Sequence, residues 1–296
     1  MFIIYINDLI RSSQILKFIM FADDTNIFFS HKNITDLVAI VNQELAKVST
    51  WLKINKLSLN VTKTHFILFH FRQCKLATPV SIKIDNVAIN QVKTTKFLGV
   101  IINENLSWSD HIDVVTSKCN KNLGVIRKLS YILPREVLLS LYYTLIYPYI
   151  NYCNIAWASQ PTTRLDKLLR IQKKAMRLIT NSGRDAHALP LFSILHTLTL
   201  HDVNKLQNVC FVYCSLHDLL PTAFTHYFQT NRNIHQHATR STDDLHMFSH
   251  STTLIKYTTR ILAPTIWNSL PNEFKILPNL SLFKKKCKFF FLKSYV

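Results

Sequence analysis

The stretch Lys17-Phe18-Ile19-Met20-Phe21-Ala22-Asp23-Asp24-Thr25-Asn26-Ile27-Phe28-Phe29 decides how the first part of this chain folds. Two short apolar runs flank a pair of adjacent aspartates, and this pattern predicts a strand, a tight turn and a second strand. Two carboxylates at such a tip repel each other, and a divalent cation relieves the repulsion, since Mg²⁺ accepts one or two carboxylates together with phosphate oxygens. Taken alone, these residues favour a solvated acidic turn, and a metal site at Asp23 and Asp24 is the alternative that the rest of the sequence must support.

The residues after this hairpin predict a helix and then further strands. Apolar residues recur at near-helical spacing from Asn33 to Leu52, with Asn33 or Thr35 as the cap. Next come Trp51-Leu52-Lys53-Ile54-Asn55-Lys56-Leu57-Ser58-Leu59-Asn60-Val61-Thr62-Lys63-Thr64 and a strand-like run at His65-Phe66-Ile67-Leu68-Phe69. Further along are Lys96-Phe97-Leu98-Gly99-Val100 and Asn105-Leu106-Ser107-Trp108-Ser109-Asp110-His111-Ile112.

Taken together, these blocks resemble segments of reverse transcriptases in the same order and spacing. Phe21-Ala22-Asp23-Asp24 is similar to the F/Y-x-D-D catalytic hairpin, and Trp51–Thr64 is similar to W-x-x-x-N-x-L-x-L-N-x-x-K-T of non-LTR retrotransposon reverse transcriptases. The blocks at 96–100 and 105–112 resemble that family's primer-grip strands and the start of its thumb. Residues 263–271, with Phe283-Lys284, resemble the C-terminal region of Jockey- and CR1-like elements.

The resemblance implies a role for each matching residue. Asp23 would be the principal Mg²⁺ ligand and Asp24 the peripheral one. Lys63 would lie near the outgoing pyrophosphate, where an ammonium group offsets negative charge or donates a proton; an ordinary surface lysine is the alternative. The primer end would rest on Phe97, Leu98 and Gly99, where glycine permits close backbone approach. The partners implied are an RNA template, a DNA primer and dNTPs.

The same comparison shows what the chain lacks. The family's first catalytic palm strand carries another aspartate upstream of the hairpin, and fingers motifs precede that strand. Here 22 residues precede Asp23, and their one acidic residue is Asp8. Two-metal phosphoryl transfer needs carboxylates from more than one element, with the ions roughly 3.5–4 Å apart. We therefore expect an N-terminally truncated polymerase, inactive by itself, whose Met1 is an internal methionine of a longer reading frame.

The chain is strongly basic, with 35 lysines and arginines against 17 acidic residues and a formal charge of +18. Residues 107–296 hold 23 of the basic residues and 10 of the acidic ones. The electrostatic field of such an excess of positive charge attracts the phosphate backbone of a nucleic acid. With only 3 glycines the chain cannot form a Gly-rich phosphate loop, which excludes Walker-type ATPases and nicotinamide enzymes.

One predicted helix, from Arg164 to Thr180, separates apolar from basic residues. Asn181-Ser182-Gly183 is the expected stop after it, with Gly183 as the left-handed cap. Its apolar side would hold Leu165, Leu168, Leu169, Met176 and Ile179. We expect the opposite side to contact a template or primer, with a solvated helix face as the alternative. That side carries Arg164, Lys167, Arg170, Lys173, Lys174 and Arg177.

The six cysteines show no C-x-x-C pair. Cys210 and Cys214 lie one helical turn apart near His217, so a zinc site is conceivable there, although buried helical thiols are favoured. His235 and His237 are a weaker metal signal. Free thiols and the lack of an export signal in the first residues indicate a reducing intracellular setting, which for this family would be the nucleus.

The uncharged stretch from Val137 to Thr163 reaches membrane-spanning length. Pro148 and scattered polar residues fit a lipid-facing helix badly, so we expect two buried helices broken near Pro148 and no membrane partner. A membrane-associated protein is the alternative.

These observations predict an α+β protein dominated by helices. Residues 1–106 would be a partial polymerase palm with the hairpin, one helix and antiparallel strands. Residues 107–183 would be a helical thumb, and residues 187–296 a mostly helical basic region interrupted by a loop from Thr230 to Ser251. The favoured function is RNA-directed DNA polymerase of a non-LTR retrotransposon. A non-enzymatic module that binds RNA or DNA is the second hypothesis, and the sequence carries no signal for an oligomeric state.

Overall fold

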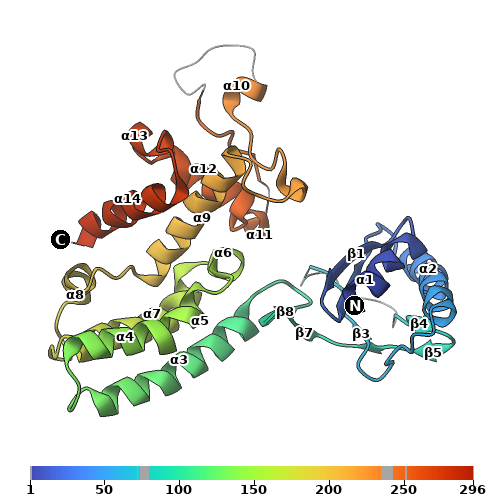
Figure 1. Ribbon diagram of the computed structural model, residues 1–296, viewed down its shortest axis with the longest axis horizontal. Coiled ribbons are helices and arrows are strands. Elements are labelled where there is room, and N and C mark those ends of the chain that lie inside the picture. The colour runs from blue at the N-terminus through green and yellow to red at the C-terminus, as the bar shows by residue number, and fades with distance from the viewer. Residues whose placement is uncertain (1, 72, 74–79, 235–242, 251, 296) are drawn as a thin grey trace. The chain divides into compact units, whose positions relative to one another are not determined.

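The computed structural model describes residues 2–71, 73, 80–234, 243–250 and 252–295, and it divides the chain into two compact units, Met1–Ser107 and Trp108–Val296. Figure 1 shows strands and a long helix in the first unit and helices throughout the second. The predicted α+β class, dominated by helices, agrees with this mixture.

The first unit begins with two short helical turns and continues through the aspartate hairpin, one long helix and a series of short strands. Its elements are α1 (Phe2–Ile6), the 3-10 helix η1 (Asn7–Ser12), β1 (Lys17–Phe21), β2 (Asp24–Phe28), α2 (Ile34–Ile54), β3 (His65–Phe66), β4 (Lys83–Ile84), β5 (Val87–Ala88), β6 (Asn90–Gln91), β7 (Thr94–Phe97) and β8 (Val100–Asn103).

The strands of the first unit pair in twos. β1 with β2, β4 with β5, and β7 with β8 form antiparallel hairpins, as predicted. The pairing of β3 with β6 is parallel, which the sequence analysis did not expect. The segment between them contains the β4–β5 hairpin, and the chain returns alongside β3 in the same direction, so that the Val92 N–H donates to the Phe66 carbonyl at 2.9 Å.

Helix α2 closely matches the predicted helix from Asn33 to Leu52. Asn33 is its N-cap, and the Asn33 side chain accepts the Thr35 N–H at 3.0 Å, which satisfies one of the free donors of the first turn. The inner face of α2 packs on a small core with the first helical turns and the β4–β5 hairpin. That core consists of Ile6, Leu9, Leu16, Leu45, Val48, Ile82, Ile84 and Ile89.

The second unit is helical. Its elements are α3 (Ser109–Leu129), α4 (Arg135–Leu145), α5 (Tyr147–Asn151), α6 (Asn154–Trp157), α7 (Thr162–Ile179), α8 (Ala188–Ile194), α9 (Leu200–Leu216), η2 (Thr222–Phe224), α10 (Asn231–Ile234), α11 (Thr253–Lys256), α12 (Thr259–Asn268), α13 (Asn272–Lys275), α14 (Leu280–Leu292) and η3 (Lys293–Tyr295).

One continuous hydrophobic core serves the whole second unit. Helix α3 packs along α7, while α12 and α14 pack on α9. A fully buried glutamine, Gln172, ties these helices together inside the core. Its amide donates to the Tyr142 hydroxyl at 2.8 Å and to the Leu198 carbonyl at 2.9 Å, and its oxygen accepts the Leu200 N–H at 2.8 Å. The residues of the expected thumb and C-terminal region therefore share one interior.

The predicted stop at Asn181-Ser182-Gly183 is confirmed, but the prediction that Gly183 is its left-handed residue is wrong. Helix α7 ends at Ile179, and the left-handed residue is Asn181, with φ 50°, while Gly183 does not have a positive φ. The Ser182 N–H donates to the Arg177 carbonyl at 2.9 Å and the Asn181 N–H to the Leu178 carbonyl at 3.3 Å, which is the Schellman arrangement. Asparagine replaces glycine here because its short polar side chain tolerates the left-handed conformation.

The uncharged stretch from Val137 to Thr163 is broken where Pro148 predicts, with α4 ending at Leu145 and α5 carrying the proline in its first turn. A further short helix, α6, follows. Within the residues that the structure describes, none of the helices has both the length and the apolar character that a bilayer crossing requires. The expected loop from Thr230 to Ser251 includes α10 and a bridge between Thr230 and Leu245, while His235 and His237 lie outside the described residues.

Candidate metal hairpin and nucleic-acid surface

The aspartate pair lies at the tip of the β1–β2 hairpin, as predicted. Phe21 pairs with Asp24, so Ala22 and Asp23 form a two-residue turn. Ala22 has φ 53°, a left-handed value that an alanine adopts at an energetic cost and that two-residue hairpin turns demand. The turn thus holds Asp23 at the apex and Asp24 at the first position of the returning strand.

The hairpin buries one face and exposes the other. Phe18, Met20 and Ile27 pack toward the core of the first unit. On the opposite face Ile19 is 50% exposed and Phe21 is 59% exposed, and Asp24 lies directly across from Phe21. Because side chains alternate along a strand, Asp24 shares this open apolar face.

Both carboxylates are exposed, and among the described residues neither forms an ion pair with a basic side chain. Carboxylate oxygens are suitable Mg²⁺ ligands, so the donor type fits the metal. The number of donors does not complete a site, because the described part of the chain contains no cluster of three side chains able to hold a metal ion. Asp8 lies in η1 and pairs with Arg11 at 3.9 Å.

Lys63 lies in a turn that Asn60 organises. The Asn60 side-chain oxygen accepts the Thr62 hydroxyl at 2.6 Å and the Lys63 N–H at 3.2 Å, and the Asn60 carbonyl accepts the Thr64 hydroxyl at 2.9 Å. These contacts give the N-x-x-K-T pattern a physical meaning, since the asparagine fixes the backbone that presents the lysine. The Lys63 side chain is exposed and makes no ion pair within the described residues.

The preceding part of that motif forms the C-terminus of α2. Asn55 is the C-cap, Lys56 has φ 54°, and the Leu57 N–H donates to the Leu52 carbonyl at 2.9 Å. This is a second Schellman arrangement, with Lys56 as its left-handed residue and Leu57 at the next position. The sequence analysis recognised the motif without assigning these roles.

The predicted primer-grip residues form the turn of the β7–β8 hairpin. Phe97 pairs with Val100, and the two turn residues, Leu98 and Gly99, have φ of 44° and 84°. Two consecutive left-handed residues define a type I′ turn, in which glycine is favoured. Close to the same hairpin, Asn103 accepts the Ser107 N–H at 2.8 Å and donates to its hydroxyl at 2.6 Å.

Helix α7 separates its side chains largely as expected, since Leu165, Leu168, Met176 and Ile179 are buried. The six predicted nucleic-acid-binding residues divide into two groups. The exposed group is Arg164, Lys167, Arg170 and Lys174. Lys167 lies 3.8 Å from Asp113, an exposed pair of little energetic value. The half-buried group, Lys173 and Arg177, lines a cavity.

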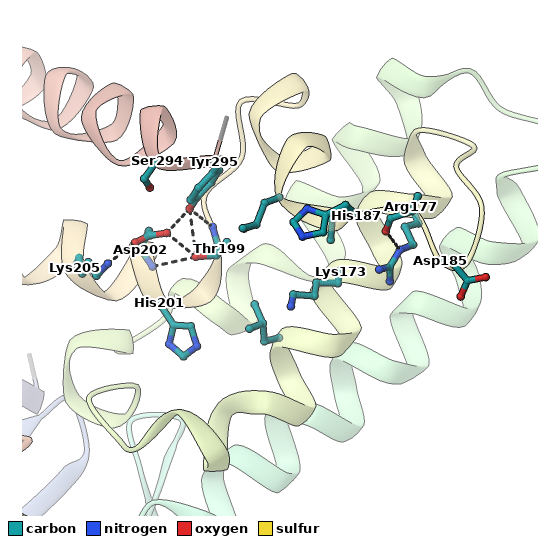
Figure 2. Close-up of a pocket in the computed structure, with 14 residues that line it drawn as sticks. Lys173, Arg177, Asp185, His187, Thr199, His201, Asp202, Lys205, Ser294 and Tyr295 are labelled. Carbon is teal, nitrogen blue, oxygen red and sulfur yellow. Dashed lines mark hydrogen bonds and ion pairs between the residues drawn. The ribbon is translucent and has the colours of Figure 1, made fainter.

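That cavity has a volume of about 460 Å³ and lies between α7, α8, the start of α9 and η3. Figure 2 shows Lys173 between His201 and His187, with Arg177 and Asp185 toward one end. The guanidinium of Arg177 donates through Nε to the Ala186 carbonyl at 2.9 Å. Sequence reasoning placed Lys173 and Arg177 on one helix face, but it did not bring them together with Asp185, His187 and His201, which come from other segments.

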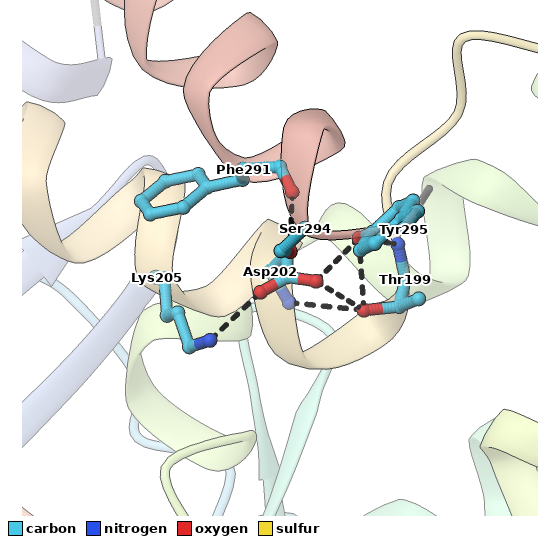
Figure 3. A network of polar contacts seen from close by, with 6 residues as sticks. All are labelled: Thr199, Asp202, Lys205, Phe291, Ser294 and Tyr295. Atoms are coloured by element: carbon cyan, nitrogen blue, oxygen red, sulfur yellow. Dashed lines mark hydrogen bonds and ion pairs between the residues drawn. The ribbon is translucent and has the colours of Figure 1, made fainter. Parts of the chain in front are cut away.

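A network of polar contacts closes one end of the cavity (Figure 3). The Asp202 carboxylate accepts the Thr199 hydroxyl at 2.7 Å, the Lys205 ammonium at 2.9 Å and the Tyr295 hydroxyl. The Thr199 N–H donates to the Tyr295 oxygen at 3.0 Å. Burial, and then the neighbouring Asp202 charge, raise the pKa of Tyr295. The Thr199-x-x-Asp202 spacing is a capping signal that could have located the start of α9 from the sequence.

The cysteine and histidine group that was considered for zinc lies on and just after α9. Burial raises the pKa of the Cys210 thiol to about 12, and it also raises the pKa of Cys214. The His217 ring stacks on Tyr213 with centroids 3.9 Å apart, and its Nδ1 lies 2.8 Å from the Tyr213 carbonyl. These contacts give the three residues packing roles.

Comparison with known proteins finds a family model that is similar to part of the chain. Residues 1–102 match the family model described as reverse transcriptase (RNA-dependent DNA polymerase). This match covers the aspartate hairpin, the α2 motif and the β7–β8 hairpin, although it leaves the helical unit unassigned.

Two Drosophila melanogaster proteins are similar to the chain. One is "Probable RNA-directed DNA polymerase from transposon BS", which is 23% identical over 169 residues, or 54% of this chain and 18% of that protein. The other is "Probable RNA-directed DNA polymerase from transposon X-element", 24% identical over 190 residues, or 62% of this chain and 20% of that protein. The chain thus spans about a fifth of the length of these relatives. No solved structure matches it.

Proposed function

We propose that this chain is a palm and thumb segment of an RNA-directed DNA polymerase from a non-LTR retrotransposon, of the Jockey- or CR1-like kind. The observation that carries the proposal is the pair of adjacent aspartates at the tip of a two-residue hairpin turn, inside the segment that matches the reverse transcriptase model. The order of the later motifs supports it, since the Asn60 turn and the β7–β8 hairpin follow at the expected positions.

In this proposal Asp23 and Asp24 hold Mg²⁺ against the phosphates of the incoming dNTP, which supplies charge neutralisation at the transferred group. Lys63, presented by the Asn60 turn, offsets charge on the leaving pyrophosphate. The tight Leu98-Gly99 turn brings backbone close to the primer end. Residues 107–183 would act as the thumb, and the setting would be intracellular, in the nucleus.

We further propose that the two-ion site needs a carboxylate from outside this hairpin. The two aspartates are adjacent in one turn, and a second element must approach them before two ions are clamped on the attacking and leaving oxygens. Within the described residues, no third metal-binding side chain lies beside them. The chain by itself is then inactive, and it would become active when a segment carrying another aspartate is supplied.

Primer extension tests this proposal. Purified chain is incubated with an RNA template, an annealed DNA primer, dNTPs and Mg²⁺, and the Asp23→Asn variant serves as the matched control. We expect no extended primer from either protein. Extension by the unmodified chain that Asp23→Asn abolishes would contradict the incomplete site, although it would support the polymerase assignment.

A non-enzymatic nucleic-acid-binding module is the second candidate function, and a feature of the second unit favours it. The turn between α3 and α4 exposes Tyr131 by 86% and Ile132 by 78%. Arg127 and Lys128 precede them at the exposed end of α3. An exposed aromatic residue flanked by cations suits a single strand, which offers phosphates and stacking bases. Salt-sensitive binding to a single strand by a chain whose Asp23 and Asp24 bind no divalent cation would favour this second candidate over the first.

A further inference from the structure

The cavity beside α7 contains cationic groups that the protein itself leaves without a counter-charge. Lys173 is half-buried, and within the described part of the chain no carboxylate lies at ion-pair distance from its ammonium. A cation that is partly withdrawn from water carries a desolvation cost that a bound anion would offset.

One acidic group of the cavity wall, Asp202, is already engaged. One of its oxygens accepts the hydroxyls of Thr199 and Tyr295, and the other accepts the Lys205 ammonium at 2.9 Å. Its charge is therefore balanced within the network of Figure 3 and is not available to Lys173. Asp185, the second acid of the cavity wall, is exposed and lies at the end beyond Arg177 in Figure 2.

Further donors line the same cavity as Lys173. The guanidinium of Arg177 uses Nε for the Ala186 carbonyl, which orients the group and leaves its two terminal nitrogens as donors. The imidazoles of His187 and His201 lie on either side of Lys173 in Figure 2. A lysine, the fork of an arginine and two imidazoles are the donor types that recognise a phosphate group.

We propose that this cavity binds one phosphate group of a nucleic-acid strand, with Lys173 and Arg177 as the charged ligands and His187 and His201 as additional donors. The inference rests on the proposed nucleic-acid binding and adds a defined site to it. A volume of about 460 Å³ exceeds the needs of a lone phosphate and has room for an attached sugar. The phosphate could be an internal diester or a strand end.

The test compares two neighbouring lysines of α7. Lys173→Met keeps the aliphatic stem but removes the cavity charge, whereas Lys174→Met removes an equal charge from the exposed side of the same helix. The full chain is titrated onto a short labelled single-stranded DNA, and its anisotropy gives the affinity. We expect Lys173→Met to weaken binding about tenfold, the size of a lost charge-assisted hydrogen bond, and Lys174→Met to weaken it about twofold.

The same titration with 5′-phosphorylated and 5′-hydroxyl DNA separates the two sources of phosphate. A loss confined to the phosphorylated strand assigns the site to a strand end, and an equal loss for both strands assigns it to an internal diester. Equal effects of the two methionine variants would overturn the cavity site. That result would leave the hairpin assignment intact, because binding of Mn²⁺ at Asp23 and Asp24 tests the hairpin separately.

A second measurement uses the unmodified protein and does not depend on how the variants fold. Inorganic phosphate is added during NMR observation of the histidine imidazoles. We expect the resonances of His187 and His201 to shift, while those of His31, an exposed histidine of the first unit, stay unchanged. Shifts of the same size at all three histidines, or none at the cavity pair, would contradict the site.

Discussion

Tyr295 donates its hydroxyl proton to Asp202 and accepts the Thr199 N–H, so a single phenol joins η3 to the first turn of α9. The side chain is buried, and its loss would leave a backbone donor and a carboxylate oxygen short of partners. An unsatisfied buried polar group costs more than an average hydrogen bond contributes. This one hydroxyl therefore stabilises the packing of α14 and η3 on α9.

We predict that Tyr295→Phe lowers the free energy of unfolding by about 1–2 kcal/mol. Urea unfolding of the full chain, followed by circular dichroism, measures the change. The matched control is Tyr131→Phe, which removes a hydroxyl from a side chain that is 86% exposed, and it is expected to leave stability unchanged. Equal effects of the two substitutions would show that the contacts of Tyr295 contribute nothing to stability.

Two histidines of the second unit make stability depend on pH. Burial, and then Lys118, lower the pKa of His111, which lies edge-on to Trp157. Burial also lowers the pKa of His201. The nearby charges of Asp202 and Asp166 oppose this shift, whereas those of Lys205 and Lys173 add to it. A histidine with a depressed pKa binds its proton more weakly in the folded chain than in the unfolded chain, so acid favours unfolding.

We accordingly predict that the free energy of unfolding falls as the pH drops from about 7.5 to 5.5, across the ordinary histidine range. His201→Gln should reduce this fall, and urea midpoints at the two pH values measure it. Glu44 and Asp85 do not confuse the result. Hydrogen bonds from Lys47 and Ser13 lower the pKa of Glu44, and hydrogen bonds from Lys53 and Ser49 lower the pKa of Asp85. The stability that these two carboxylates contribute is therefore lost only at more acid pH. A stability that rises on acidification would contradict the prediction.

At the level of elements, local sequence patterns correctly predicted the helix ends and turns that depend on residues close together in the chain. The Asn33 cap, the extent of α2 and the two hairpins follow from capping, periodicity and turn residues. The error at Gly183 has the same origin, since the nearby Asn181 competes for the left-handed position and the helix ends there. The left-handed residues of the two Schellman ends are Lys56 and Asn181, and neither is a glycine, which simple rules for glycine stops overlook.

The β7–β8 turn provides a prediction for one element. Gly99 has φ 84° in a type I′ turn, so Gly99→Ala should cost about 1–2 kcal/mol in stability through strain at a left-handed position. Gly124 lies inside α3, where an added Cβ meets nothing within 4 Å, so Gly124→Ala should stabilise by about 0.5–1 kcal/mol. Thermal unfolding of the two variants measures these stability changes, which are expected to have opposite signs. A neutral Gly99→Ala would show that the turn does not need glycine.

At the scale of the whole molecule, the sequence could not reveal the cavity or its network. Thr199 and Tyr295 are 96 positions apart, and no periodicity links a helix start to a residue so distant. The same holds for Gln172, whose amide joins α4, α7 and the start of α9. Such contacts depend on how helices pack, and packing follows from the summed shape of the core.

The net charge of the chain predicts salt-dependent binding to nucleic acid. Each phosphate contacted adds about 0.9 to the slope of log affinity against log salt for duplex DNA. Replacing Arg164 and Arg170 on the exposed face of α7 by glutamine should therefore reduce that slope by about two. Replacing Lys32 and Lys83 in the first unit removes equal charge and is expected to change it less. Equal slopes for both double variants would mean that only total charge matters.

The central claim is that Asp23 and Asp24 form part of a divalent-metal site whose remaining ligands come from elsewhere. Mn²⁺-induced broadening of backbone amide signals tests it most directly, because the paramagnetic ion marks residues near its binding position. We predict broadening centred on Ala22–Thr25, lost in Asp23→Asn, with an affinity of about millimolar, because the described residues bring together two carboxylates and no third side-chain ligand there. Unbroadened hairpin signals would contradict the metal role, and micromolar affinity would contradict the incomplete site.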